Sequence, residues 1–540
     1  MSACSDVRSL NHVGALRNVQ IRSIRLPIAG FAIALLAACA GNSPRPVRPS
    51  TDIDERGFRE HIRNLSSDEF KGGLPQDSGD VKTTQYLVEQ LRHLGLKPAS
   101  GASYLQPVPM VEILATDASL KVLLPSSLPL RYGEDMVIWT RREVPVTQLQ
   151  GSELIFVGYG IVAPEYAWDD YANTDVRGKT VLVLLNDPRF ASAMTAYGLW
   201  RYKIEEAARH GASGVLLVHE ARAAAISWNA VVNTWTGRQL HASHESNADL
   251  PIVEGWLSAS SASALFGRAK LDLAVLSQAA ARSGFKPVSL GLRVDASIHN
   301  TIRTLTASNV VAVLPGTHRG REYVLFTAHW DHLFNGARDN ASGTAGLLML
   351  AQSLSRTLPK PDRSMVFLAL AGEESGLLGS TYYVEHPIFP LRETLGVINL
   401  DTLHIGGPTR DVTVFGYGNS ELEGLFRDAA NFQGREMRPD PNAYQGQYYR
   451  SSQISFAKKG IPALYGKAGT DDAARGPTWG EKELTDFAAF RHHQPADQYL
   501  VEWDLRGTID DLKLYLSVGL QLTKAQRFPD WYPGSEFRVH

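Results

Sequence analysis

The C-terminal half of the chain alternates apolar runs with helical patterns, and this alternation constrains the fold more than any other feature. Apolar runs at 323–328, 365–371 and 396–400 read as buried strands, and the segments 344–354 and 509–523 read as amphipathic helices. Strands that alternate with helices are typical of an α/β domain with a mostly parallel sheet covered on both faces. Because ligands bind beyond the carboxyl ends of such strands, we expect the functional residues there.

The middle of the chain has a strand–helix pattern of its own. Apolar runs at 154–158, 180–185 and 214–218 indicate short buried strands, and 202–210 indicates a helix. Nearer the N-terminus, residues 80–94 place leucines and a valine on one helical face before a glycine that favours a helix end. A chain of 540 residues is long enough for several domains.

Charge and cysteine content exclude several classes of function. The 54 basic and 56 acidic residues give a net charge of −2, and no basic tract stands out, so a nucleic-acid partner is not expected. The only cysteines are Cys4 and Cys39. The body of the chain therefore has no disulfide, no thiolate metal site and no cysteine nucleophile, and any metal must be held by His, Asp and Glu.

The N-terminus has the pattern of an export signal. Residues 1–38 carry four arginines against one acid, and the apolar run 26–38 ends at Cys39. The sequence Leu-Ala-Ala-Cys at 36–39 resembles the lipobox of bacterial lipoproteins, which implies lipidation of Cys39. An ordinary signal cleaved near Ala38 and a short membrane anchor are the alternatives. The residue after Cys39 is Ala40 and not an aspartate, which resembles lipoproteins that are sent to the outer membrane. We therefore expect a lipid-anchored protein of the cell envelope that faces the periplasm.

Polar segments follow the predicted strands and suggest a metal site. Five stand out: 328–332 (AHWDH), 336–343 (GARDNASG), 372–375 (GEES), 399–402 (NLDT) and 492–497 (HHQPAD). Each alone is a common strand end, helix cap or surface loop. Together in one domain they supply the imidazole and carboxylate ligands that Zn²⁺ prefers.

The order and spacing of these five segments resemble the co-catalytic di-zinc exopeptidases, which include bacterial leucyl aminopeptidases and glutamate carboxypeptidase. The resemblance covers roughly residues 300–520 and implies a three-layer αβα zinc-exopeptidase domain with two Zn²⁺ ions. By position, it makes Asp339 the bridging carboxylate. It assigns one zinc to His329 and Asp401, and the other to Glu374 and His493.

The same resemblance assigns two further roles in the site. Glu373, which precedes a ligand, would be the general base, and the Asp331 carboxylate would fix the imidazole of His329. One segment departs from the family, because Ser452 and Gln453 stand where many bacterial relatives have an acid and a histidine. This departure leaves the ligand set complete but puts substrate contacts and rate in question.

The middle region, 149–285, resembles a small α+β protease-associated domain inserted into such peptidases. In relatives this domain overhangs the active site, although a passive insertion is the alternative, and no catalytic residue is assigned to it. The expected division is then 1–38 signal, 39–50 lipidated cysteine and tether, 51–148 N-terminal part of the peptidase domain, 149–285 inserted domain, and 286–540 catalytic domain.

The expected function is an aminopeptidase that acts on peptide substrates. A carboxypeptidase of the same superfamily, a single-metal cyclase or deacylase, and an inactive peptide-binding lipoprotein are the alternatives. The sequence contains neither a Gly-x-Ser-x-Gly elbow nor a His-Glu-x-x-His motif, which argues against serine-hydrolase and thermolysin-like mechanisms. The preferred side chain at the cleavage site, the native metal and the oligomeric state stay open.

Overall fold

The computed structural model describes residues 53–70, 78–123, 126–191, 193–220, 226–243 and 249–538. The predicted signal, the lipobox with Cys39 and the tether through residue 50 lie outside these described residues. Every helix in the described ranges falls short of the length and apolar character that a bilayer crossing needs.

The C-terminal part of the chain forms a mostly parallel sheet with the strand order β17–β16–β18–β15–β13–β14–β12. β13 pairs in parallel with β14 and β15, and β15 with β18, whereas β12 and β16 join antiparallel to β14 and β18. The strands are β12 (Val288–Leu314), β13 (Arg319–His329), β14 (Arg363–Leu370), β15 (Thr394–Asn399), β16 (Asp411–Phe415), β17 (Glu436–Pro439) and β18 (Ala463–Ala468). The predicted mostly parallel sheet is confirmed.

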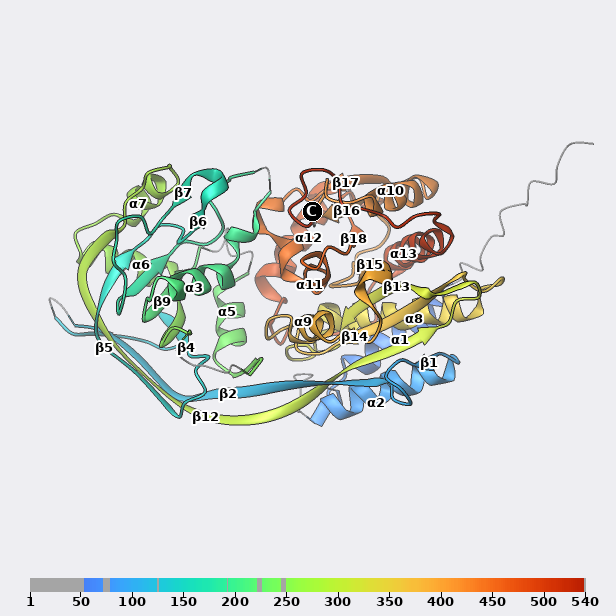
Figure 1. The fold of residues 1–540 in the computed structure, drawn as a ribbon, viewed down its shortest axis with the longest axis horizontal. Helices are drawn as coiled ribbons and strands as arrows, with labels where there is room; N and C mark the ends of the chain where they lie inside the picture. The colour runs from blue at the N-terminus through green and yellow to red at the C-terminus, as the bar shows by residue number, and fades with distance from the viewer. Residues whose placement is uncertain are drawn as a thin grey trace, which may run out of the picture. The chain divides into compact units, whose positions relative to one another are not determined.

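Helices cover both faces of this sheet and make three layers, which we call the main body (Figure 1). Neighbouring residues of β13 point to opposite faces of the sheet. Phe326 packs in the hydrophobic core on one face, and Leu325 packs in the core on the other face. One face carries α1 (Glu55–Leu65), α2 (Ser78–His93), α8 (Ser342–Arg356), α10 (Leu422–Phe432) and α13 (Arg506–Lys524), and the opposite face carries α9 (Leu378–Glu385) and α11 (Gln453–Ala457). The three-layer prediction therefore holds for this body, to which the N-terminal helices also belong.

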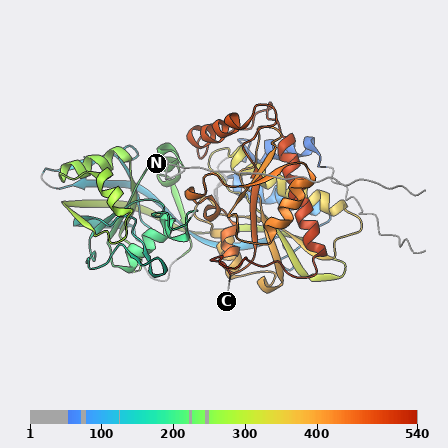
Figure 2. The same cartoon turned by 90° about the horizontal axis from the view of Figure 1, so that it is seen from above.

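The middle of the chain forms a second set of elements, which we call the inserted body, from β4 to α7 (Figure 2). Its strands follow the order β5–β8–β9–β11–β4, and all neighbours pair in parallel except β11 with β4. The strands are β4 (Met136–Trp139), β5 (Val146–Phe156), β8 (Thr180–Val183), β9 (Gly214–Val218) and β11 (Val253–Leu257), and the helices are α3 (Trp200–Arg209), α5 (Trp228–Trp235), α6 (Ala259–Arg268) and α7 (Leu273–Ala280). The predicted boundary at residue 149 falls inside β5, and β4 lies before that boundary.

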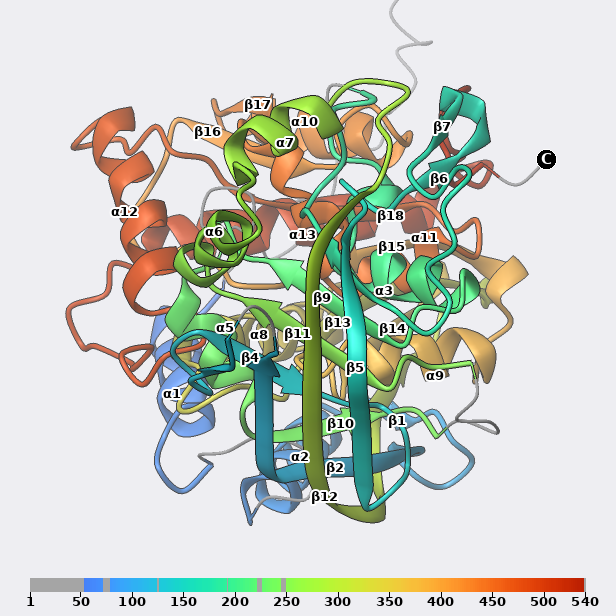
Figure 3. The same ribbon diagram turned by 90° about the vertical axis from the view of Figure 1, so that its left-hand side faces the viewer.

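Two long strands join the bodies. β2 (Leu105–Val122) pairs with β12 antiparallel from Leu105 opposite Val310 to Val122 opposite Val294, with one bulge near His299. β12 also pairs with β5, as Figure 3 shows. The remaining elements are β1 (Lys97–Pro98), β3 (Leu128–Leu130), β6 (Val162–Ala163), β7 (Trp168–Asp169), β10 (Arg238–His241), which pairs with β2, and α12 (Pro477–Phe490).

The inserted body buries a lysine in its core. Lys203 on α3 is fully buried, and its Nζ donates to the carbonyl of Tyr159 at 2.7 Å. Burial lowers the pKa of Lys203 to about 7, and burial also raises the pKa of Asp170 to about 6. The ammonium form of Lys203 is therefore costly to the folded protein near neutral pH.

This burial predicts a pH-dependent stability. Between pH 7 and the ordinary lysine value of 10.5, the unfolded chain binds a proton that folded Lys203 does not, so the free energy of unfolding rises with pH across that window. Asp170 is ionised in both states there. We expect Lys203→Met to melt higher than wild type by a margin that is largest at about pH 7 and shrinks toward about pH 9.5. A margin independent of pH in thermal melts would contradict the lowered pKa.

Candidate metal centre

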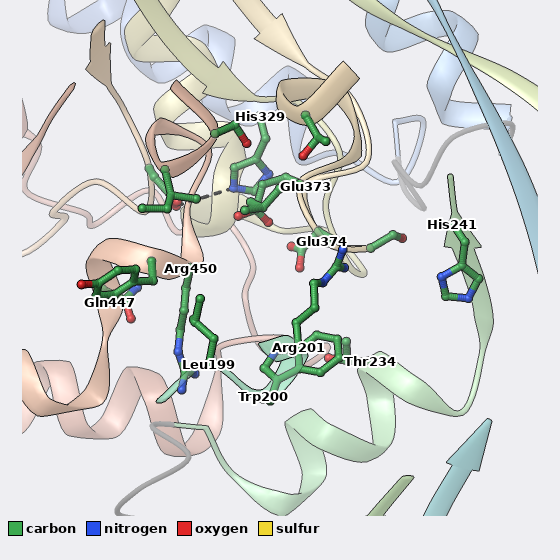
Figure 4. Close-up of a pocket in the computed structure, with 18 of the residues that line it drawn as sticks. Leu199, Trp200, Arg201, Thr234, His241, His329, Glu373, Glu374, Gln447 and Arg450 are labelled. Atoms are coloured by element: carbon green, nitrogen blue, oxygen red, sulfur yellow. Dashed lines mark ion pairs between the residues drawn. The ribbon is translucent and has the colours of Figure 1, made fainter. Parts of the chain in front are cut away.

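The predicted ligands come together at the carboxyl ends of neighbouring parallel strands. His329 is the last residue of β13, Glu373 and Glu374 follow β14, and Asp401 follows β15. Asp339 lies in the short turn Ala337–Ala341 that leads into α8, and His493 lies in the loop after α12. Figure 4 shows His329, Glu373 and Glu374 at one end of the pocket.

Asp339 occupies the centre of the cluster, with a different group on each carboxylate oxygen. Its Oδ1 lies 3.4 Å from Nε2 of His329, and its Oδ2 lies 3.6 Å from Nε2 of His493. His492, which the sequence analysis did not assign, approaches more closely, with its Nε2 3.0 Å from the same Oδ2. Asp339 therefore faces both sides of the cluster, as a bridging ligand must.

Each predicted pair of ligands lies close together in the structure. Nε2 of His329 lies 3.5 Å from Oδ1 of Asp401, and Nε2 of His493 lies 2.8 Å from Oε2 of Glu374. All of these side chains are largely buried, which makes their charges expensive unless they are compensated.

The donor set fits a divalent metal ion. Three groups each bring their ligand atoms within 4.8 Å of one another: Asp339, His492 and His493; His329, Asp339 and Glu374; and His329, Glu373 and Asp401. Oε1 of Glu374 is buried and accepts no hydrogen bond from the described residues. Carboxylates and imidazoles held this closely, with a buried acceptor left over, are suitable zinc ligands. The tandem histidines at 492–493 were the sequence signal for the extra candidate.

Glu373 has the electrostatic setting of a general base. Burial raises the pKa of its carboxyl well above the ordinary value, and repulsion from Asp401, Glu374 and Asp331 raises it further. A carboxylate with a raised pKa accepts a proton readily near neutral pH. The positive charge of His329 acts in the opposite direction but does not reverse the shift.

Asp331 supports the site in a different way from the one expected. Its backbone carbonyl oxygen lies 2.9 Å from Nδ1 of His329, whereas the nearest carboxylate oxygen is 3.9 Å away. The carboxylate instead accepts the backbone N–H groups of Glu373 and Glu374, each at 3.1 Å. Asp331 thus contacts the imidazole through its main chain and shapes the two-glutamate turn through its side chain.

Several supporting residues were missed by sequence reasoning. Thr402 donates to Oδ1 of Asp401 at 2.7 Å, and Ser451 donates to Oδ2 of the same carboxylate. Asp497 accepts the backbone N–H groups of Arg338 and Asp339, each at 3.0 Å, and so fixes the turn that carries the central ligand. Thr402 and Asp497 lie inside the NLDT and HHQPAD segments, so the motifs contained a signal for them.

The family departure at Ser452 and Gln453 lies beneath the site. Both side chains are buried, and Oε1 of Gln453 accepts from Nδ2 of Asn399 at 2.9 Å. Neither residue lines the pocket beside the ligands, whereas their neighbours Arg450 and Ile454 do. In this chain Gln453 therefore supports Asn399, two residues before Asp401, from outside the pocket.

A cavity of about 550 Å³ opens beside the ligands and has walls from both bodies. The inserted body contributes side chains that include Trp139, Arg201 and Thr234, and the main body contributes Glu373, Glu374 and Gln447 among others (Figure 4). The guanidinium of Arg201 packs against Gly376, in the loop after Glu374. A Cβ atom added to Gly376 would lie only 1.7 Å from Nη2 of Arg201, so the arginine occupies the space that a larger residue would need. A ligand in this cavity would contact both bodies.

Comparisons with known proteins agree with the geometry. Residues 309–517 match the model of peptidase family M28. Aminopeptidase NAALADL1 of Mus musculus is 37% identical over 126 residues, which is 22% of this chain and 17% of the mouse protein. Leupeptin-inactivating enzyme 1 of Streptomyces exfoliatus is 30% identical over 196 residues, covering 34% of this chain and 43% of that enzyme.

These relatives are matched over less than half of their own lengths. A solved structure extends the likeness of the fold: the aminopeptidase from Aneurinibacillus sp. strain AM-1 superposes with a TM-score of 0.54 at 18% identity, over 89% of this chain and 95% of that one. The matched segment contains β13 to β18 of the main sheet, only the last residues of β12, and all five polar segments described above. The chain is therefore similar to peptidase family M28 over residues 309–517.

Proposed function

We propose that this protein is a zinc-dependent exopeptidase that releases N-terminal residues from peptides, and that it holds two Zn²⁺ ions per chain. The observation that carries the proposal is the central position of Asp339, whose two oxygens face His329 on one side and the histidines of the 492–493 loop on the other. The names of two relatives, an aminopeptidase and a leupeptin-inactivating enzyme, point the same way.

His329, Asp401, Glu374 and His493 would hold the ions, with Asp339 shared between them. When bound, two such ions lower the pKa of a water molecule and polarise the scissile carbonyl. The side chains of this chain do the rest. Glu373 takes the proton of the attacking water and passes it to the nitrogen of the leaving amine.

A carboxypeptidase is the second candidate, and Arg201 favours it. The guanidinium of Arg201 lines the cavity and forms no ion pair with any residue that the structure describes. A cation in that place would suit a carboxylate, such as the C-terminus of a peptide. The first candidate is preferred because the mouse relative, 37% identical over 126 residues, is named an aminopeptidase, whereas the Caenorhabditis elegans relative named a glutamate carboxypeptidase 2 homolog is 33% identical over 118 residues.

We further propose that Cys39 carries a lipid that anchors the protein to the outer membrane, with the peptidase facing the periplasm, and that the inserted body is a protease-associated domain. The lipobox-like sequence at 36–39 supports the anchor. Loss of the protein from the membrane fraction in a Cys39→Ser variant is the expected result, and unchanged fractionation would rule the anchor out.

Asp339 provides a test of the shared ligand. We expect Asp339→Asn to lose both ions, because an amide oxygen without charge is a much poorer bridge between two cations. The measurement is the zinc content per chain after dialysis, by atomic emission. A variant that keeps one ion at wild-type strength would show that Asp339 serves a single metal.

The reaction itself is tested on a mixture of peptides with free and acetylated N-termini, with products identified by mass spectrometry. We expect sequential loss of residues from free N-termini only, abolished by a chelator and restored by zinc. Removal of residues from C-termini would move the protein to the carboxypeptidase branch. Absence of any cleavage would favour the cyclase, deacylase or peptide-binding alternatives.

Glu373→Gln is the matched control for this assay. The amide is nearly isosteric but cannot accept the water's proton, so kcat should fall by about 10²–10⁴-fold. Zinc content should stay near that of wild type, because Glu373 lies outside the proposed ligand set. Joint loss of zinc and activity would mean that Glu373 is a ligand and not the base.

A further inference from the structure

The inserted body contacts a proposed metal ligand directly. Oγ1 of Thr234, on α5, lies 2.8 Å from Nδ1 of His493, and Nδ2 of Asn233 donates to the His493 carbonyl at 2.9 Å. A third contact, from Nε2 of Gln494 to Oγ of Ser227, is 3.5 Å long and joins the same two segments. Contacts from both ends of α5 thus hold the loop that carries His493.

The hydrogen atoms in these contacts determine the state of the imidazole. Thr234 donates its single hydroxyl proton to the carbonyl of Ala230 at 2.8 Å, one turn earlier in α5. Its oxygen can then only accept from His493, so Nδ1 must carry the ring proton. With Nδ1 protonated, Nε2 is the nitrogen left to bind a metal ion, and it lies 2.8 Å from Oε2 of Glu374, the other proposed ligand of the same ion. This is the tautomer that binds a metal through Nε2.

The backbone of His493 also needs support. Its φ angle is +55°, in the left-handed region, which costs a residue with a side chain free energy relative to the common conformations. The Asn233 amide holds the carbonyl of this residue. Asn233 therefore fixes the backbone, and Thr234 fixes the ring.

We propose that Thr234 and Asn233 are positioning residues for the metal centre, so that the inserted body completes the half of the site that contains His493 and Glu374. The proposal rests on the metal ligands of the proposed function. It goes beyond that function because it gives the inserted body a role in metal binding that is separate from covering the substrate. Groups that orient a metal-bound imidazole typically change metal affinity by 10–100-fold.

The test measures zinc binding by the full-length protein in competition with a chromophoric chelator, with no peptide present. Thr234→Val keeps the shape of the side chain but removes the acceptor. We expect one of the two ions to bind about 10–100-fold more weakly and the other to be unchanged. Thr234→Ser keeps the hydroxyl and should restore wild-type affinity.

Thr236→Val is the matched control. Thr236 lies at the end of the same helix, and its hydroxyl donates to the carbonyl of Val232 at 2.7 Å, the same type of bond that Thr234 makes to Ala230. Among the described residues, no hydrogen bond joins the Thr236 side chain to His493. We expect this variant to bind both ions as wild type does.

Asn233→Ala gives a second route if Thr234→Val does not fold, and it should also weaken one ion. Equal affinities in wild type, Thr234→Val and Asn233→Ala would overturn the proposal. So would a Thr234→Ser variant as weak as the valine variant, or a Thr236→Val variant as weak as Thr234→Val.

The outcomes separate this proposal from the proposed function. A wild-type protein that binds two ions but cleaves no peptide would end the exopeptidase proposal. The comparison of zinc affinities between wild type and the Thr234 variants would still test the positioning role. A wild-type protein that binds no zinc would end both. Full activity with no effect of Thr234→Val on zinc affinity would end the positioning role alone.

Discussion

A buried cluster of opposite charges is the constraint on which the rest of the structure depends. Acids and imidazoles lie within a few ångströms of one another at the edge of the main sheet, with Asp339 between the two sides. Carboxylates removed from water destabilise a fold unless cations or donors compensate them. The surrounding residues supply the donors: backbone amides face Asp331 and Asp497, and hydroxyls face Asp401.

The main sheet makes this cluster possible because its neighbouring strands run in parallel. β13, β14 and β15 end side by side, so each delivers one ligand-bearing turn to the same edge. Close packing then holds the turns in place. A side chain on Gly343, at the start of α8, would begin 2.2 Å from Oδ1 of Asn340, whose amide binds the carbonyl of Leu400 just before Asp401.

Much of this could be predicted from the sequence, and the exceptions have a common physical cause. The proximity of residues 329, 339, 374, 401 and 493 could be expected from the order and spacing of their motifs, which resemble those of a known family. The contact between Thr234 and His493 spans 259 positions and depends on how one body packs on the other, which no periodicity reports. The Asp331 carboxylate was expected to contact the imidazole of His329, but it accepts the backbone N–H groups of Glu373 and Glu374 instead. The backbone geometry of the turn determines this direction, and the sequence pattern does not report it.

The paired strands β2 and β12 have a consequence for how firmly α5 is held beside the site. A flexible tether would leave Thr234 at a low effective concentration near His493, and much of each contact would be lost to the entropy of closure. A long antiparallel ladder, interrupted by one bulge and braced by the ion pairs of Glu112 with Arg238 and Arg303, removes most of that freedom before any contact forms. Bending of this ladder would move α5 away from His493 and weaken metal binding. The stiffness of β2 and β12 therefore contributes to the metal affinity of a site that they do not line.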